Sequence, residues 1–309
     1  MDRFKNILFF ADGAKGEKSA LIGAMELAQH NNARLTILAV VPEVSTNDER
    51  LSPSIKKLQT ALIYERRETI DQLLSGTLPE TDAPKVETLV KAGEKDFIEV
   101  IKTVTDGKYD LLVKSVDPAG ALSHALFGNH DLRLLRQCPC PVWIIKPTRR
   151  KNIRTILAAV DLTKQEDSSL RLASRIVGIA SGVAAKEGAR LHILTAWDQP
   201  VDASIKKRME VEAYEEFTNH YKDQIRRRFE KLVANNRHKA TEDHIIRGNP
   251  EKAITRFVSD YDVDLLVMGT LSRSGIPGLL IGNTAERVLN QVNCSVLTMK
   301  PEGFTATIK

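Results

Sequence analysis

The chain has 309 residues, of which 42% are hydrophobic and 28% are charged. That balance is ordinary for a globular protein, and it excludes the collagen-like and low-complexity classes. Lys and Arg exceed Asp and Glu by five, a net charge too mild to predict a nucleic-acid partner. Aromatic residues make up only 5%, so single-stranded nucleic acid would find few side chains on which to stack.

The sequence gives no sign of a membrane or secretory protein. It has no run of about 18 apolar residues, so we expect no membrane partner. The first residues lack the long apolar segment and the cleavage site of a signal peptide. Three cysteines are too few for a disulfide framework, which fits a reducing compartment. We therefore predict a cytoplasmic protein.

Short β-branched runs alternate with amphipathic stretches along the chain. The first half predicts strands over residues 6–11, 34–41, 84–90, 110–114 and 142–146. Its long helix carries Leu58, Leu62, Ile70 and Leu73 on the apolar face.

The second half predicts strands over residues 154–160, 190–196, 243–247, 263–268 and 295–299. Between the second and third of these, apolar residues at steps of three and four predict a helix: Tyr214, Phe217, Tyr221, Ile225, Phe229 and Leu232. The basic run Arg226–Arg228 lies mostly on its polar side, and we interpret it as a solvated face.

The two halves repeat each other at an offset of 154 residues. Residues 110–147 align with 264–301 without a gap, and 14 of these 38 positions are identical. The beginnings of the halves also match, so that Asp12 pairs with Asp161. We predict two homologous domains, 1–148 and 152–309, joined by a basic linker.

Each domain is predicted to be a doubly wound, Rossmann-like α/β unit with a five-stranded parallel sheet. Such sheets bind ligands beyond the carboxyl ends of the strands, where the strand order reverses. Asp12 and Asp161 each follow the first strand of their domain. Such a carboxylate can cap the next helix, or contact a ribose hydroxyl or base edge, or hold a metal; we leave the choice between capping and ligand contact open.

The segment Gly13–Ser19 looks like a phosphate loop but lacks the required spacing of its glycines, so we reject that interpretation. A stronger signal follows the fourth strand of the second domain. Gly269, Gly275, Gly278 and Gly282 fall within fourteen residues, and Asn283 is predicted to cap the next helix in a capping box with Glu286 three residues later.

Glycine backbone and a helix N-terminus can together cradle a phosphate, and Arg273 can add positive charge. The alternative is a flexible connection before a well-capped helix. In the first domain Ser115, Ala121 and His124 replace three of the four glycines, and Pro118 removes an amide donor. We expect this counterpart to be degenerate.

Other candidate chemistry is sparse. Cys138-Pro-Cys140 is weak for zinc, and because Cys140 recurs as Cys294 we interpret these cysteines as structural, with a redox role for Cys138 only if it is exposed. His124 and His130 are interpreted as exposed loop residues. No nucleophile elbow, HExxH or EF-hand pattern occurs, so we predict no catalytic residue and no metal site.

The stretches RLLRQCPCPVWIIKP at 133–147 and GTLSRSGIPGLLIGNTAERVL at 269–289 resemble the universal stress protein family, and the whole chain is similar to its tandem, two-domain E type. Nucleotide-binding members carry Gly-x2-Gly-x9-Gly-[Ser/Thr] after the fourth strand. The resemblance matches Asp161, Gly269 and Gly282 to that site, with Ser272 at the second glycine and Asn283 at the Ser or Thr. In the first domain only Asp12 and Gly128 match, and Asn129 departs.

The resemblance also implies that residues 141–146 and 295–299 pair within the chain, as the last strands of two family subunits do. The protein would then be a pseudo-dimer, able to remain a monomer or to form a homodimer. Three hypotheses follow: a stress-response protein that binds a small anionic ligand or a partner protein without turnover, an ATP-binding switch or slow ATPase using the second domain alone, or an interaction protein with both sites inactive.

Overall fold

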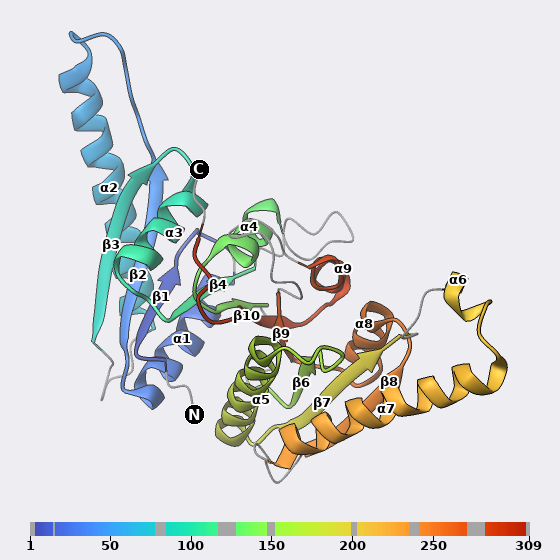
Figure 1. Ribbon diagram of the computed structural model, residues 1–309. Coiled ribbons are helices and arrows are strands. Elements are labelled where there is room, and N and C mark those ends of the chain that lie inside the picture. The colour runs from blue at the N-terminus through green and yellow to red at the C-terminus, as the bar shows by residue number, and fades with distance from the viewer. Residues whose placement is uncertain are drawn as a thin grey trace. The chain divides into compact units, whose positions relative to one another are not determined.

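A computed structural model describes residues 4–14, 16–77, 85–116, 128–146, 152–198, 203–234, 241–270 and 282–306 (Figure 1). The chain divides into two compact units, the first built mainly from residues 3–149 and the second mainly from residues 150–303.

The first domain alternates strands and helices in the predicted order. Its elements are β1 (Asn6–Phe10), α1 (Glu17–Asn31), β2 (Arg34–Pro42), α2 (Ser52–Ser75), β3 (Val86–Gly93), α3 (Asp96–Asp106), β4 (Leu111–Ser115), α4 (Asn129–Gln137) and β5 (Val142–Ile145). The strands lie in the order β3-β2-β1-β4-β5, and each neighbouring pair is parallel.

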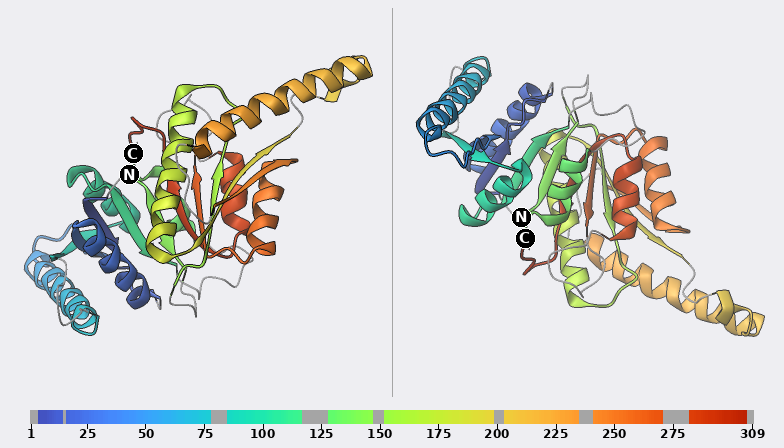
Figure 2. Two further views of the ribbon diagram at one scale, coloured as in Figure 1. Left: turned by 90° about the horizontal axis from the view of Figure 1, so that it is seen from below. Right: turned by 90° about the horizontal axis from the view of Figure 1, so that it is seen from above.

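The second domain repeats this arrangement with one additional short helix. Its elements are β6 (Thr155–Val160), α5 (Asp167–Glu187), β7 (Arg190–Trp197), α6 (Ala203–Lys206), α7 (Val211–Ala234), β8 (Thr241–Arg247), α8 (Pro250–Asp260), β9 (Leu265–Gly269), α9 (Asn283–Gln291) and β10 (Ser295–Met299). Its parallel strands are ordered β8-β7-β6-β9-β10. Helices cover both faces of this sheet, with α5 beside α7 and α8 beside α9 (Figure 2).

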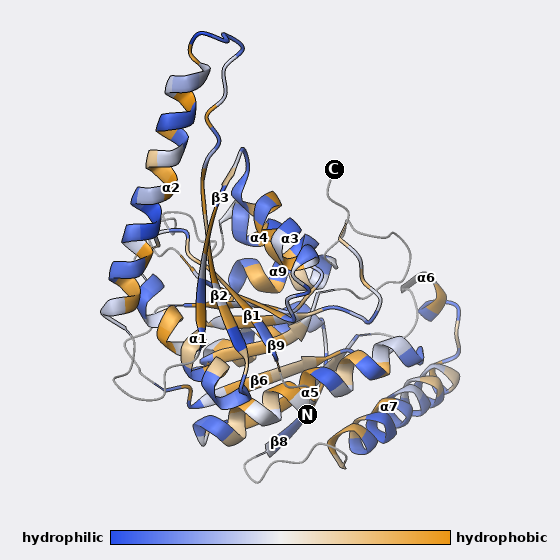
Figure 3. Ribbon diagram, turned by 90° about the vertical axis from the view of Figure 1, so that its left-hand side faces the viewer, coloured by the Kyte–Doolittle hydropathy of each residue, from blue (hydrophilic) through white to orange (hydrophobic). Residues whose placement is uncertain are grey.

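All ten predicted strands are confirmed, with ends that differ by a few residues. The central strands are buried on both faces, as their nearly continuous apolar sequences require. In Figure 3 the strands β1, β2 and β6 are mostly orange, whereas blue residues run along α2 and α7. The strand order reverses between β1 and β4 in the first domain and between β6 and β9 in the second, so each domain has the predicted switch point.

The long helices α2 and α7 bury less of their predicted apolar faces than the sequence indicates. Ile70 is buried on α2, but Leu58 is 48% exposed, and on α7 Ile225 is buried while Phe217 is 42% exposed. The helix α2 has 24 residues and is about 36 Å long, whereas β2 and β3, on which it packs, have nine and eight residues and span about 31 and 27 Å. The N-terminal part of each helix therefore extends past the sheet that it covers.

The identical residues Asp110 and Asp264 have a structural role. Asp110 accepts hydrogen bonds from the backbone N–H groups of Lys5 and Asn6 at 2.6 and 3.0 Å. Asp264 accepts the same pair of bonds from Arg154 and Thr155 at 2.8 and 3.0 Å. Each carboxylate links the start of the fourth strand to the start of the first. These bonds lie at the amino-terminal ends of the strands, whereas the predicted ligand site lies at their carboxyl ends.

Among the helices in the described ranges, none is long and apolar enough to cross a membrane.

Candidate ligand pocket

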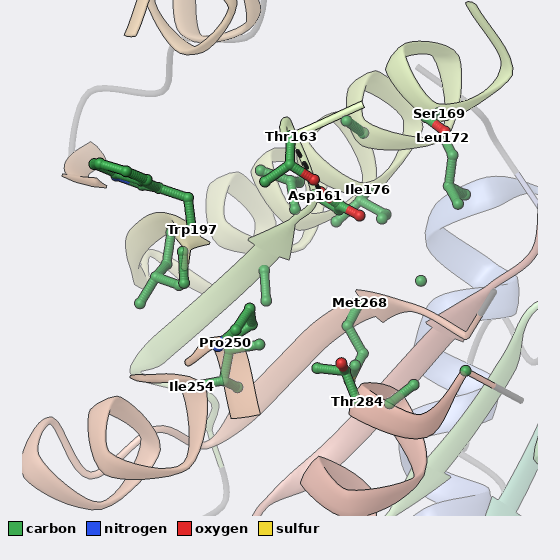
Figure 4. A pocket seen from close by; sticks show the side chains of 18 of the residues that line it. Asp161, Thr163, Ser169, Leu172, Ile176, Trp197, Pro250, Ile254, Met268 and Thr284 are labelled. Atoms are coloured by element: carbon green, nitrogen blue, oxygen red, sulfur yellow. Dashed lines mark hydrogen bonds between the residues drawn. The ribbon is translucent and has the colours of Figure 1, made fainter. Parts of the chain in front are cut away.

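A pocket of about 360 Å³ lies at the switch point of the second domain, within the size range of small-molecule sites (Figure 4). Strands β6, β7 and β9 form its floor, and α5, α7, α8 and α9 contribute to its walls. The apolar part of the lining includes Leu172, Ile176, Trp197, Ile254 and Met268. Polar groups are contributed by Asp161, Thr163, Ser169, Asp198, Thr270 and Thr284.

Asp161 lies at this pocket, as predicted for a ligand contact, and it also stabilises a local turn. Its Oδ1 accepts hydrogen bonds from the N–H and the hydroxyl of Thr163 at 3.0 and 2.6 Å. Among the described residues its Oδ2 has no hydrogen-bond partner. The carboxylate caps the turn after β6 and not the start of α5, and it retains an acceptor for a ligand.

The glycines predicted at the pocket fall into two groups. Gly269 and Gly282 both line it. A Cβ at Gly269 would lie 3.1 Å from Cδ2 of Leu172, so a larger residue would press on the wall of the pocket. Ser272, Arg273, Gly275 and Gly278 lie outside the described residues.

The predicted helix cap is wrong by one residue. Gly282, with extended φ and ψ of −64° and 142°, is the N-cap of α9, and as a glycine it has no side chain that could cap that end. Asn283 is therefore the first helical residue; it is exposed and is not among the residues that line the pocket. Asn is favoured at an N-cap position, but glycine also adopts it, and here the Gly282 carbonyl accepts the first helical bond from Glu286.

The uncapped end of α9 is a feature of the pocket itself. Gly282, Thr284 and Ala285 line the pocket from the first turn of that helix. The first N–H groups of a helix have no partners inside it, and the helix dipole makes this end positive. The pocket therefore combines an apolar interior, a carboxylate acceptor at Asp161 and a positive helix end.

In the first domain the corresponding space contains a buried ion cluster. Lys114 occupies the position of Met268, and its Nζ lies 2.6 Å from Oδ2 of Asp12 and 2.8 Å from Oδ1 of Asp131. Burial alone would lower the pKa of Lys114, but the carboxylates of Asp131 and Asp12 outweigh it and raise that pKa. Burial raises the pKa of Asp131, which Lys114 opposes. We call Asp12, Lys114 and Asp131 the lysine triad.

The two Asp residues after the first strands therefore share one role and differ in another. Asp12 Oδ1 accepts the N–H of Ala14 at 3.2 Å, a turn like that of Asp161. Its Oδ2 is paired with Lys114, whereas the matched position in the second domain is Met268. Ala285 likewise stands where the first domain has Asp131. In the first domain the acceptor of Asp12 is thus already occupied by Lys114, which agrees with the expectation that this counterpart is degenerate.

A second buried carboxylate lies beside the triad. Glu17 accepts the N–H of Gly13 at 2.8 Å and lies 3.8 Å from a guanidinium nitrogen of Arg66. Burial raises its pKa. A carboxyl group in the first turn of α1 occupies the place where a phosphate loop would bind its anion, which agrees with the rejection of such a loop there.

The first turn of α4 contains three residues that the sequence singled out. Gly128 is the N-cap of α4, and Asn129 is the first residue of that helix. His130 is exposed as expected, but it lies in the first turn of α4 and not in a loop, with Nδ1 2.9 Å from Asp96. His124 lies outside the described residues.

All three cysteines are buried and none forms a disulfide; the sulfur atoms of Cys138 and Cys140 are 3.5 Å apart. Their burial favours the structural interpretation.

Arg228 differs from the predicted solvated face, because its guanidinium donates to the carbonyl of Leu162 at 2.8 Å and so fixes the turn after β6. The position of Arg228 on the helix did not predict this contact, because the contact is with a residue of a distant turn.

Comparisons with known proteins agree with the fold. The model of the universal stress protein family matches residues 3–146 and again residues 152–300. Universal stress protein E of Photorhabdus laumondii is 26% identical over all of this chain and 99% of its own length. Universal stress protein E of Escherichia coli K12 is 25% identical over all of this chain and 98% of its own.

Solved structures give the same result. A putative universal stress protein from Pseudomonas aeruginosa UCBPP-PA14 is 26% identical, with a TM-score of 0.68, covering 97% of this chain and 94% of that one. A universal stress protein from Archaeoglobus fulgidus, 17% identical with a TM-score of 0.59, covers 96% of this chain and 98% of that one and shares the fold.

Proposed function

This chain belongs to the universal stress protein family, in a tandem form similar to universal stress protein E, and on that basis we propose that it acts in the stress response by binding one small anionic ligand in its second domain. The observation that carries the proposal is the asymmetry between the two switch points. One holds an open pocket with Asp161 at its edge, and the other holds the lysine triad.

The pocket's chemistry suggests what such a ligand contains. An apolar or flat ring would bury against Leu172, Ile176 and Met268. A hydroxyl or amine would donate to Oδ2 of Asp161, and an anionic group would face the N-terminus of α9. A nucleotide has these three parts.

We propose binding without turnover, in the cytoplasm. The second candidate is an ATP-binding switch or slow ATPase confined to the second domain. It is favoured by Gly269 and Gly282, which meet at the pocket with the uncapped helix end. ATP would be the ligand in that case.

The first experiment identifies the ligand. The purified chain is denatured, released small molecules are analysed by mass spectrometry, and ATP is titrated calorimetrically onto the emptied protein. Carried nucleotide or heat of ATP binding favours the nucleotide ligand, and phosphate release at a steady rate favours the ATPase. A different released molecule would keep the binding proposal and reject ATP.

A matched pair of variants tests the asymmetry. Asp161→Asn keeps an oxygen for the Thr163 turn but removes the charged acceptor, so ligand affinity should fall about tenfold or more, as expected for one charge-assisted hydrogen bond of about 1.5–3 kcal/mol. Asp12→Asn makes the same change in the first domain and should leave affinity unchanged. Equal losses from both variants would contradict a single site in the second domain.

A further inference from the structure

A cluster of metal-ligating side chains lies at the opposite end of β7 from the ligand pocket. His192 is near the start of β7, and Glu242 and His244 are on its neighbour β8. In the parallel pairing His192 stands opposite Glu242, and Leu194 stands opposite His244. Because side chains alternate along a strand, residues two apart share a face, so all three project to the same side of the sheet.

The ligand atoms are close enough to share one ion. Nδ1 of His192 is 3.1 Å from Nε2 of His244 and 3.6 Å from Oε2 of Glu242. One donor atom from each residue lies within 4.8 Å of the others. Two bonds of about 2.0–2.1 Å at a tetrahedral angle would place two ligand nitrogens about 3.3 Å apart.

Two aromatic side chains hold the imidazoles in place. Phe257 and Tyr261 of α8 stack at 4.0 Å between centroids, and His192 contacts both rings, with centroids 5.3 and 5.1 Å away. His244 packs against the same two rings, with centroids 4.7 and 5.9 Å away.

Access for an ion is provided by the edge of the sheet. β8 is the last strand in the order, and the side chain of Glu242 is 55% exposed. His192 is fully buried, so the cluster runs from solvent to the core. Two histidines and a carboxylate form a set of ligands typical of zinc.

We propose that His192, Glu242 and His244 form a site for a divalent transition metal ion, with zinc as the fitting ion, that ties the edge strand β8 to β7. The sequence contained no signal for it, because the ligands come from two strands and fit no local spacing motif. The alternative is that the two histidines share only a proton, in which case no metal binds.

The test uses the full chain, stripped of metal with a chelator. Zinc is titrated by calorimetry in competition with a chelator of known affinity, and cobalt is added separately to record its visible absorption. Glu242→Gln should weaken zinc binding by at least about tenfold, the lower end of what even an outer-sphere partner contributes. His244→Gln should abolish the cobalt absorption.

Two control variants match these changes. Like Glu242→Gln, Asp243→Asn removes one carboxylate charge from β8, but on the opposite face of the strand. His220→Gln removes an exposed histidine of α7. Both should bind zinc as the unaltered chain does, and at equal zinc concentration their melting temperatures should rise more than that of Glu242→Gln. Absence of zinc binding to the unaltered chain, or equal binding by Glu242→Gln and Asp243→Asn, would overturn the proposal.

Because Glu242 is exposed, Glu242→Gln is expected to fold even if His244→Gln does not. The ligand pocket does not include any of the three metal-binding residues. Failure of zinc to bind would therefore leave the proposed ligand site untouched, and failure of nucleotide to bind would leave the metal site untouched.

Discussion

Replacing Lys114 by methionine should strongly destabilise the first domain. The substitution removes the cation 2.8 Å from Asp131, a carboxyl group that is only 5% exposed. Breaking a buried ion pair from one side costs about 3–5 kcal/mol, because the remaining charge is left without compensation. Asp12 loses the same partner, but its side chain is 22% exposed and water can solvate it.

The second domain suggests the compensating change. Its residues at the matched positions are Met268 and Ala285, so the double variant Lys114→Met/Asp131→Ala recreates an arrangement that this protein already folds. Replacing a buried ion pair by apolar residues is often neutral or stabilising. We expect the double variant to recover most of the stability that Lys114→Met loses, with a coupling of at least about 2 kcal/mol between the two sites.

The assay can follow each domain separately, because the chain has two tryptophans and each domain contains one. Trp143 is buried on β5, and Trp197 is buried at the end of β7. Urea unfolding in a Trp197→Phe background therefore reports the first domain alone. For Lys114→Met a loss of about 3–5 kcal/mol corresponds to a fall of roughly 6–20 °C in melting temperature, at about 2–4 °C per kcal/mol.

Two results would refute this reasoning. A loss below about 1 kcal/mol for Lys114→Met would mean that Asp131 is solvated or protonated and that the triad is not a buried ion cluster. A double variant as unstable as Lys114→Met would mean that the lysine acts through its aliphatic stem and not through its charge.

Three further predictions concern the pocket and the buried acid. Met268→Lys should let an ammonium group pair with Asp161, as Lys114 pairs with Asp12, and so remove the acceptor that the ligand needs. Ligand binding, measured by Trp197 fluorescence, should then be lost; unchanged affinity would contradict the site. Gly269→Val should weaken binding far more than Gly128→Val, because a Cβ at Gly128 meets nothing within 4 Å; calorimetric titration of both variants compares them. Burial raises the pKa of Glu17 above its ordinary 4.5, so the folded chain holds that proton more tightly than the unfolded chain. The unaltered protein should therefore gain stability relative to Glu17→Gln as pH falls from 7 through the folded-state pKa of Glu17, and the gain should be complete below pH 4.5. Urea unfolding at several pH values measures this gain. The opposite trend would be inconsistent with the burial of Glu17.

The sequence predicted the fold well because its signals are local and repeated. Buried strands read as continuous apolar runs, and an internal repeat fixed where each domain begins. The switch point follows from topology, and Asp161, Gly269 and Gly282 do line a pocket there; that they bind a ligand stays a prediction. Pairing of residues 141–146 with 295–299 and the homodimer stay predictions.

What the sequence did not predict depends on contacts between distant elements. The lysine triad joins residues from three separate segments, and Lys114 alone reads as an ordinary substitution at the end of a strand. The exposed Leu58 could not be foreseen, because periodicity gives the face of a helix but not how far the sheet extends beneath it. His192 and His244 likewise meet only through strand pairing.

If the second domain holds the one ligand site proposed above, the lysine triad also limits how steeply the protein can respond to the concentration of that ligand. Cooperative binding requires at least two coupled sites, and a chain with one ligand site saturates along a simple hyperbola with a Hill coefficient of one. In the present chain any steeper response has to come from association between chains, so dilution would abolish it.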